Sequence, residues 1–331
     1  MKFKKCAALL LVSSCLLTGC TTSSAKKVDS KYVVASLEKG NKTKNIFADN
    51  LYKDIIDNSS NNSTVFNAVL QNLVDQKFPV NDDMKEDAAT IIKQIKSAYK
   101  SNYGDNYKDS LNQALTSAGY KNLSEYRQRM IKQIQYANFL LDYIDDHFDD
   151  VFNDYYQQCA PKYVSLIKIS VSDTSSPTDD ETSKLNEVKE LISNTDKSFG
   201  DIAQDYSDDS TSSKKGSLGI VDSKDTSGIA NSYGENVFNA IEALSEGQVS
   251  DVITGNDGYY FVKVTSTDKK TLKKELKKTD IDSHLLAYDD YLQYVVYNSY
   301  KINYKDKDIK KIVQEVVNKA LEERKTERGE A

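Results

Sequence analysis

The sequence predicts an α+β fold in which a small sheet flanked by helices is inserted between two helical segments. Apolar residues recur at helical spacing over residues 46–158 and again after residue 267. Between Pro161 and residue 268, alternating β-branched runs are interleaved with short amphipathic stretches. The chain has 331 residues, more than one typical domain, and we therefore expect at least two domains.

The first twenty residues have the pattern of a bacterial lipoprotein signal. Three lysines precede an apolar run over residues 6–17, which is too short to span a bilayer and has the length of a signal-peptide core. Leu-Thr-Gly at residues 17–19, followed by Cys20, resembles a lipobox. We predict that residues 1–19 are removed, that a lipid on Cys20 anchors the chain to the extracytoplasmic face of a cell membrane, and that residues 20–31 form a tether. The alternative is an ordinary secretory signal with a chance cysteine.

Composition excludes several classes of function. Removal of residues 1–19 takes away three lysines and no acids, so the formal net charge moves from −6 to −9. Such an acidic body disfavours nucleic acid as a partner. The mature chain keeps Cys159 as its one cysteine besides Cys20, and its two histidines are His147 and His284. This set disfavours a zinc centre or a Cys/His hydrolase, and we expect no metal and no cofactor.

Residues 32–160 are expected to form a helical N-terminal part that opens with a strand. The β-branched run at residues 32–37 predicts that strand, and the periodicity of residues 46–158 predicts a series of helices. The longest helix is expected to include residues 126–144, with Ser124 as its N-cap.

Residues 161–268 are expected to form the α+β unit. The predicted strands cover residues 163–171 and 259–264, with a further turn into a strand at 247–250; the predicted helices cover 184–192 and 237–244 and begin again at Phe199; a polar loop is expected at 207–219. After this unit, residues 269–331 are expected to be helical and to pack on the N-terminal part, with residues 322–331 frayed.

Three segments of the α+β unit resemble motifs of the parvulin family. Residues 206–219, Tyr-Ser-Asp-Asp-Ser through Gly-Ser-Leu-Gly, resemble its signature loop. Residues 240–250 resemble its helix-to-strand turn, and residues 258–264, Gly-Tyr-Tyr-Phe-Val-Lys-Val, resemble its closing strand. The motifs occur in the parvulin order and spacing, which implies a parvulin-like, or rotamase, domain with peptidyl-prolyl cis-trans isomerase as its family activity.

The whole arrangement resembles the PrsA-type foldases. A lipidated N-terminus, a helical part, a parvulin insert and a helical C-terminal part follow one another as in that family. The resemblance implies that the flanking helices pack as a chaperone-like domain, and that unfolded or newly secreted proteins are the partners.

Parvulins surround the prolyl amide with two histidines, an Asp or Cys and a hydroxyl group, above a floor of Met and Phe. Transferred by position, Asp209 falls on the Asp/Cys position and Tyr260 on the second histidine position. The first histidine position falls on Leu166 or Ile167, so neither family histidine is present. Tyr260 either donates a hydrogen bond to the substrate or fills the sheet, and Asp209 either acts in catalysis or caps the turn that follows it.

The proline pocket is also altered. Val237 falls on the position of the pocket Phe, Tyr233 lies near that of the Met, and Leu218 completes the predicted pocket. Glu242 stands at a second core Phe position, and Ser217 replaces the acid of the signature loop. The two loop glycines, Gly216 and Gly219, are expected to serve loop geometry through positive φ angles.

Two features of the C-terminal part have open interpretations. Five tyrosines recur every third residue from Tyr288 to Tyr300 and are either core residues or a groove for unfolded chains. Six lysines between residues 269 and 278 either form a solvated helix face paired with Glu275 or contact anionic lipid headgroups.

Three functions follow from these observations. The first is a membrane-anchored foldase with a feeble or inactive isomerase domain. The second is an active isomerase that uses Asp209 and Tyr260, and the third is a non-catalytic surface-binding lipoprotein.

Overall fold

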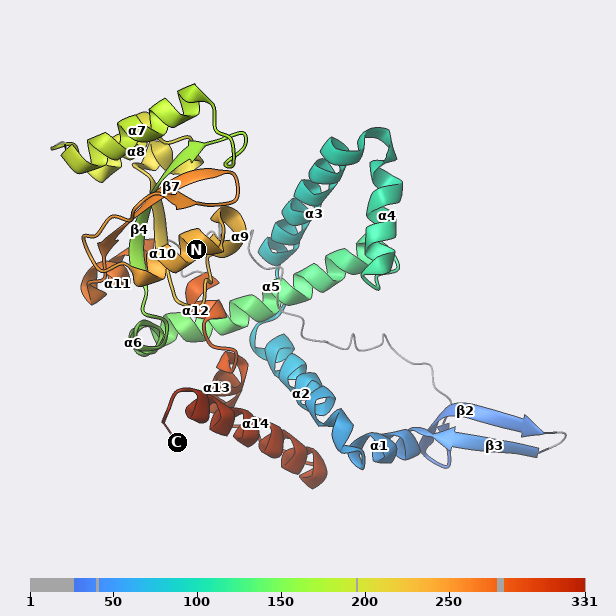
Figure 1. Ribbon diagram of the computed structural model, residues 1–331. Helices are drawn as coiled ribbons and strands as arrows, with labels where there is room; N and C mark the ends of the chain where they lie inside the picture. The colour runs from blue at the N-terminus through green and yellow to red at the C-terminus, as the bar shows by residue number, and fades with distance from the viewer. Residues whose placement is uncertain (1–26, 40–41, 195, 279–282, 331) are drawn as a thin grey trace. The chain divides into compact units, whose positions relative to one another are not determined.

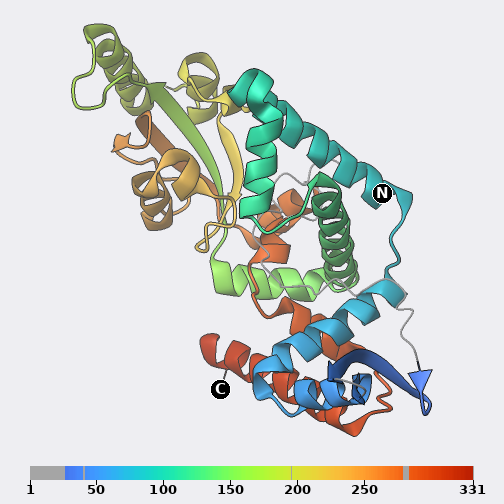
Figure 2. The same ribbon diagram turned by 90° about the vertical axis from the view of Figure 1, so that its right-hand side faces the viewer.

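The computed structural model describes residues 27–39, 42–194, 196–278 and 283–330, and Cys20 lies outside them. The chain separates into two compact units. We call residues 143–290 the sheet unit, and residues 27–142 together with 291–330 the helical unit. Figures 1 and 2 show the elements of both units from two directions.

The sheet unit is built on a four-stranded antiparallel sheet with the strand order β5-β4-β7-β6. Its strands are β4 (Lys162–Ser170), β5 (Ser217–Val221), β6 (Ile253–Thr254) and β7 (Gly258–Ser266). Strands β4 and β7 lie at the centre, which fits their β-branched and aromatic residues. Their register places Lys168 opposite Tyr260 and Leu166 opposite Val262.

Helices cover both faces of this sheet (Figure 1). The helical elements of the unit are α6 (Phe148–Cys159), α7 (Asp179–Asn194), α8 (Phe199–Tyr206), η3 (Ser210–Lys214), α9 (Ile229–Tyr233), α10 (Glu235–Ala243), α11 (Lys269–Lys278) and α12 (Ser283–Ala287). On one face Val188, Phe199 and Ile202 from α7 and α8 pack on Ile167 and Phe261. The other face carries a second apolar cluster, formed with α9 and α10, which we call the Tyr260 cluster. Its buried residues are Val164, Leu166, Val221, Ile229, Val237, Ile241, Tyr260 and Val262.

The helical unit begins with a three-stranded sheet of β1 (Lys27–Val28), β2 (Lys31–Lys39) and β3 (Lys42–Phe47). The following helical elements are α1 (Ala48–Ile56), η1 (Ser59–Asn61), α2 (Asn62–Lys77), α3 (Asp82–Tyr103), η2 (Gly104–Asn106), α4 (Tyr107–Ser117), α5 (Leu123–Asp146), α13 (Leu292–Ser299) and α14 (Lys307–Glu327). Helices α2 and α14 pack together although the whole sheet unit separates them in the sequence. Among the described residues, no helix is both long and apolar enough to cross a membrane.

The predicted α+β architecture is confirmed, while several element boundaries were wrong. Residues 46–47 belong to β3 and not to a helix, because they pair with Ala35 and Val33 across the hairpin. The N-cap of α5 is Asn122 and not Ser124, since the Asn122 side chain accepts a hydrogen bond from the backbone N–H of Glu125 at 2.9 Å. The C-terminal helix α14 continues to Glu327, well into the segment expected to be frayed.

Three further predictions are corrected. The loop expected at residues 207–219 contains η3 and the start of β5. The strand expected at 247–250 is reduced to an isolated bridge between Val249 and Lys263. Within residues 269–331, which were expected to be helical, Tyr288 and Tyr291 lie between α12 and α13 and outside both helices.

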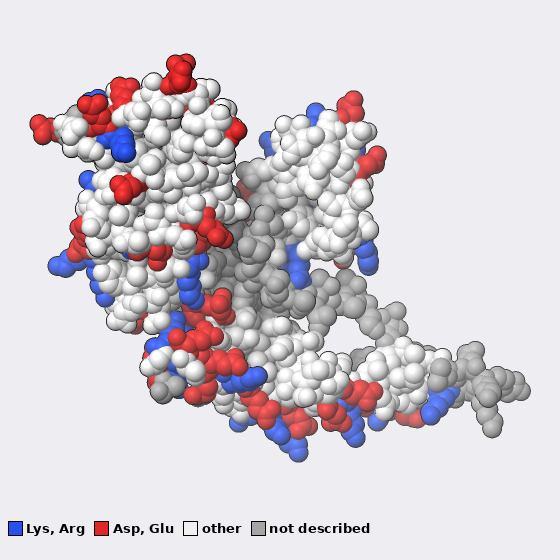
Figure 3. Space-filling model, in the orientation of Figure 1, with Lys and Arg blue, Asp and Glu red and all other residues white. Residues whose placement is uncertain are grey.

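The packing units divide the chain at Asp142 and Asp290. The ranges 32–160, 161–268 and 269–331 remain a prediction about domains. The two divisions differ because α6 and α11, which flank the predicted parvulin-like range, belong to the sheet unit. On the face shown in Figure 3, Lys and Arg are interspersed with Asp and Glu over the surface.

Candidate functional site

Tyr260 is the central residue of the candidate site; it lies near the start of β7 and is fully buried. Its hydroxyl donates a hydrogen bond to Asp257, which in turn forms an ion pair with Lys168 on the neighbouring strand. The Asp257 side chain is 61% exposed, so this small network links the interior of the domain to solvent. The one proton of the Tyr260 hydroxyl is therefore already engaged within the protein.

Leu166 and Ile167 are the two residues predicted at the first parvulin histidine position. Both candidates, Leu166 and Ile167, are fully buried in β4, but they face opposite sides of the sheet. Leu166 belongs to the Tyr260 cluster, whereas Ile167 packs under α7 and α8. Of the two, Leu166 is therefore the one that shares a face of the sheet with Tyr260, and its side chain is apolar.

The predicted pocket residues lie together around Tyr260. Val237 is fully buried in the Tyr260 cluster, and Leu218 and Tyr233 are half-buried against it. The rings of Tyr233 and Tyr260 make an edge-to-face contact with centroids 5.8 Å apart. Gly255 permits this contact, because a Cβ there would lie 2.3 Å from the Tyr233 carbonyl oxygen and 2.5 Å from the Tyr260 ring.

Asp209 lies next to this cluster as the N-cap of η3. Its Oδ1 accepts hydrogen bonds from the backbone N–H of Thr211 at 2.8 Å and from the Thr211 hydroxyl at 2.6 Å. The side chain also interacts with Tyr233. Asp209 therefore performs the capping role that the sequence allowed, while remaining within the electrostatic reach of the site.

The two tyrosines are held neutral. Burial, together with the charge of Asp209 and a hydrogen bond to it, raises the pKa of Tyr233 to about 12. Burial and the hydrogen bond to Asp257 raise the pKa of Tyr260 well above its usual range. Hydrogen bonds from Lys168 and Tyr260 lower the pKa of Asp257, which is therefore ionised at neutral pH. The site therefore presents polar groups beside an apolar surface. Tyr233, Tyr260 and Asp257 do not form an acid–base pair with pKa values near 7.

The conformations of two glycines shape the loop that leads into β5. Gly216 and Gly219 have φ angles of 75° and 84°, which confirms the expected positive values. At Gly216 a Cβ would also lie 2.4 Å from the carbonyl oxygen of Leu166, so the loop approaches β4 as closely as backbone atoms allow. Ser217 donates a hydrogen bond to the Tyr163 hydroxyl at 2.8 Å and holds the loop to the sheet without an acid.

Glu242 gives the first prediction. It is half-buried, its Oε1 is a buried oxygen without a hydrogen-bond partner, and burial raises its pKa above the usual 4.5. We expect Glu242→Leu to raise the free energy of unfolding by about 1 kcal/mol at pH 7, because it removes an unsatisfied buried acceptor. Urea unfolding of the full chain measures this change.

The stability gained by Glu242→Leu should depend on pH. The ionised form of a carboxyl group with a raised pKa destabilises the fold above that pKa, and the cost disappears as the pH falls through it. The advantage of Glu242→Leu should therefore shrink as the pH falls through the raised pKa of Glu242, and Glu242→Gln should show the part that is due to charge alone. An advantage that is equal at pH 4 and pH 7 would contradict this explanation.

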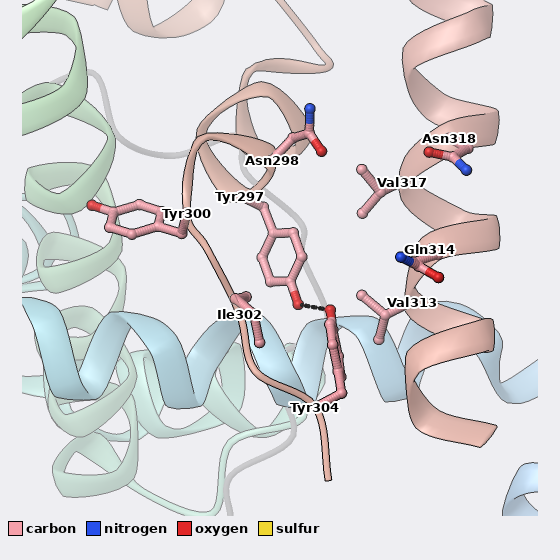
Figure 4. Close-up of a pocket in the computed structure, with 9 residues that line it drawn as sticks. All are labelled: Tyr297, Asn298, Tyr300, Ile302, Tyr304, Val313, Gln314, Val317 and Asn318. Carbon is pink, nitrogen blue, oxygen red and sulfur yellow. Dashed lines mark hydrogen bonds between the residues drawn. The ribbon is translucent and has the colours of Figure 1, made fainter. Parts of the chain in front are cut away.

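A second candidate site lies in the helical unit, between α14 and the segment that follows α13. It is a pocket of about 180 Å³. Tyr297, Ile302 and Tyr304 face Val313 and Val317 of α14 across it, as Figure 4 shows. The hydroxyl groups of Tyr297 and Tyr304 are 2.5 Å apart and hydrogen-bonded to each other. The side-chain amides of α14 that complete the lining belong to Gln314 and Asn318.

The tyrosines of the C-terminal part pack in the core, and some of them also line the pocket. Tyr294 and Tyr297 pack on Phe66 of α2, with ring centroids 4.9 and 5.1 Å away, and belong to the core. Tyr300 stacks on Phe139 at 5.8 Å and also lines the pocket. Together with Tyr304, the pocket tyrosines supply aromatic rings, and Asn298, Gln314 and Asn318 supply uncharged amides.

A buried polar cluster in the sheet unit had no signal in the sequence. Asp222 is fully buried at the end of β5, and His284 of α12 lies 3.1 Å from it through Nδ1. The hydroxyl of Tyr155 donates to Asp222 at 2.8 Å, and Thr226 donates to it as well. Thr226 and Asp222 approach the same histidine nitrogen, so the group lacks the relay geometry of a hydrolase triad.

The comparison with known proteins found a family match for part of the sheet unit. The family model of the PPIC-type PPIase domain, named Rotamase, matches residues 166–266. These residues form a PPIC-type rotamase domain. The predicted parvulin-like domain is thereby confirmed, and the matched residues include most of β4, all of β5, β6 and β7, and every buried residue of the Tyr260 cluster except Val164.

The chain is also similar to PrsA foldases, as predicted. It is 31% identical to a protein named "Foldase protein PrsA" of Staphylococcus epidermidis over 141 residues. The same identity extends over 144 residues of the protein of that name from Staphylococcus aureus strain MRSA252. Each match covers 40% of this chain and spans 41% of the relative's length.

Crystal structures of PrsA proteins were found as well. The foldase PrsA of Streptococcus pneumoniae is 20% identical with a TM-score of 0.38, over 85% of this chain and 99% of that chain. The PrsA of Bacillus subtilis is 21% identical with a TM-score of 0.36, over 85% of this chain and 98% of that chain.

Proposed function

We propose that this protein is a membrane-anchored extracytoplasmic foldase that assists the folding of secreted proteins. The proposal is supported by a segment that matches the rotamase family model, in which Leu166 and the buried Tyr260 are the residues predicted at the two histidine positions, and by a separate aromatic pocket in the helical unit. Binding of unfolded chains needs apolar and amide surface but no proton transfer. The lipid on Cys20 would hold the protein at the membrane face where secreted chains emerge.

The pocket of the helical unit is the proposed contact for unfolded clients. Its lining combines aromatic rings with the amides of Gln314 and Asn318 and includes no charged residue. Aromatic rings bury large area at a low cost in side-chain entropy, and amides bond to any peptide backbone. Such a surface suits extended chains of varied sequence.

A client assay tests the proposal. Ile302→Ser places a hydroxyl in the half-buried wall of the pocket, and we expect it to weaken suppression of client aggregation about threefold. The lipid-free Thr21–Ala331 protein would be mixed with a chemically unfolded secreted enzyme, and light scattering would be recorded. Ile56→Ser, at a half-buried residue of α1 outside the pocket, is the matched control and should leave suppression unchanged.

Two results would count against the foldase proposal. Absence of aggregation suppression by the wild-type protein would leave only a surface-binding lipoprotein. Suppression that survives Ile302→Ser but is lost in the rotamase domain variants Asp209→Ala and Tyr260→Phe would move client binding to the rotamase domain.

An active isomerase is the second candidate, and one observation favours it. Asp209 keeps its parvulin position and lies beside Tyr233 at the edge of the apolar cluster. A tertiary amide can be twisted by apolar desolvation and a single hydrogen bond, since isomerisation breaks no covalent bond. In this candidate, Asp209 and Tyr233 would do the work assigned at first to Asp209 and Tyr260.

A further inference from the structure

The β2–β3 hairpin and α1, which we call the hairpin surface, carry an unusual concentration of exposed apolar side chains. Seven large hydrophobic residues are exposed among the described residues, and five of them lie in this short segment: Tyr32, Val34, Leu51, Tyr52 and Ile55. Each of the five is between 42% and 49% exposed. We propose that the hairpin surface docks on an anionic lipid bilayer.

The Tyr52 hydroxyl donates a hydrogen bond to Asp306 at 2.6 Å, but the rings and aliphatic side chains of this segment remain exposed. Helix α1 has no buried residue, although Leu51 and Ile55 are one helical turn apart on the same side. The hairpin projects from the start of α1 (Figure 1), and α1 is the helix that packs against it. Contiguous exposed apolar groups of this kind mark an interaction site.

The charge of the segment selects an anionic partner. Residues 20–56 contain seven lysines and four acids, whereas the chain without residues 1–19 has a formal charge of −9. Lys27, Lys31 and Lys44 are exposed; Lys31 is 3.2 Å from Asp49, and the Lys27 ammonium lies 4.4 Å above the Tyr32 ring. Lysines next to an aromatic ring and aliphatic side chains are the pattern of an interfacial membrane contact.

The short tether between Cys20 and Lys27 favours a bilayer over a soluble partner as the ligand of the hairpin surface. This step rests on the proposed lipid at Cys20. Lys27 is seven positions after Cys20, so the described chain begins within about 25 Å of the lipid even when the tether is fully extended. Lys27 pairs with Tyr32 across β1 and β2, which places the exposed ring at the same short distance. The hairpin surface is thus held near headgroups at high effective concentration.

The lysine run of α11 is a weaker candidate for the same contact. Lys273 forms an ion pair with Asp149 at 2.7 Å, and Lys277 lies 4.7 Å above the Phe148 ring. Leu272 and Leu276 of this helix are buried. Its apolar side therefore already packs within the sheet unit, unlike that of α1.

The test uses the lipid-free Thr21–Ala331 protein and sedimentation with vesicles. We expect at least fivefold stronger partition onto vesicles of 40% phosphatidylglycerol in phosphatidylcholine than onto phosphatidylcholine alone, lost at high salt. The double variant Tyr32→Ser/Val34→Ser should lower that partition at least fivefold. Tyr103→Ser/Val252→Ser, which replaces the two exposed apolar residues elsewhere, should leave it unchanged.

Further variants test whether the hairpin surface or α11 makes the contact with the vesicle. Lys270→Gln/Lys274→Gln in α11 should not reduce vesicle binding. Val34→Cys labelled with an environment-sensitive fluorophore should shift to shorter wavelength when anionic vesicles are added, a readout that needs only a folded hairpin. Three results would each overturn the proposal. The protein could partition equally onto both vesicle types, or the α11 variant alone could lose binding. The hairpin variants could also lose client protection while they keep lipid binding. Lipidation of Cys20 is read separately, from the mass of the native protein and its Cys20→Ala variant.

Discussion

Replacing Asp222 by alanine is expected to lower the free energy of unfolding by about 3 kcal/mol, one of the two largest effects in this protein. Asp222 is fully buried and receives hydrogen bonds from the backbone N–H groups of Lys224 and Thr226 as well as from Tyr155 and His284. Its removal leaves several buried donors without an acceptor. Urea unfolding of the full chain at pH 7 measures the loss.

The pH dependence of this effect has a definite sign. Burial alone would raise the pKa of Asp222, but hydrogen bonds from His284, Thr226 and Tyr155 outweigh it and hold the pKa below the usual 3.8. A lowered pKa contributes stability that is present above that usual value and is lost as the pH falls through the folded-state value. The difference between wild type and Asp222→Ala should therefore narrow in acid. Asp251→Ala, at an exposed position, should change stability by less than about 0.5 kcal/mol, and equal losses in the two variants would contradict the account.

Gly258→Ala is expected to be the second severe change, with a loss of about 3 kcal/mol. A Cβ on Gly258 would lie 2.2 Å from the carbonyl oxygen of Ile169, an atom fixed by the pairing of β4 and β7. Neither central strand can move away without displacing Tyr260 two residues later. The midpoint of thermal unfolding and the near-ultraviolet circular dichroism of the buried tyrosines should both fall.

Gly219→Ala is the matched control for that substitution. Gly219 has a φ angle of 84° but open space around its Cβ position, so alanine there meets only the backbone cost of about 1–2 kcal/mol. A Gly258→Ala variant no less stable than Gly219→Ala would show that the strands adjust more freely than the structure indicates.

The parts of the fold that could be predicted from sequence are those in which local pattern and packing agree. Strands β4 and β7 and helix α10 have the period of their final structure, and the motifs around them also locate Tyr260, Val237, Tyr233 and Leu218 in one cluster. Strand β3 was missed because its first residues are polar and its partner strand, not its own sequence, makes it extended. Asn122 and Ser124 are both good capping residues, and the geometry alone selects Asn122.

Long-range polar contacts were beyond sequence reasoning. Asp222 and His284 are 62 residues apart, and no motif joins them. The same holds for the ion pair of Lys168 and Asp257, which connects β4 to the turn before β7. Whether Leu166 or Ile167 faces the site also depended on the register, because adjacent strand residues point to opposite faces.

The balance between foldase and isomerase depends on Tyr260. Its hydroxyl is buried and donates to Asp257, so it has no proton to offer a substrate carbonyl. Tyr260→Phe would remove that hydrogen bond while keeping the ring packed against Tyr233. The side chain is thus better suited to filling the sheet than to catalysis, and the rotamase domain would present clients with an apolar surface.

The most direct test of this account is catalysed cis–trans exchange of a proline peptide, measured by NMR with the lipid-free Thr21–Ala331 protein. The account predicts exchange no faster than in buffer, for wild type and for Asp209→Ala and Tyr260→Phe alike. Exchange that the wild-type protein accelerates and that Asp209→Ala abolishes would contradict it, and would establish the domain as a working isomerase with a rebuilt site.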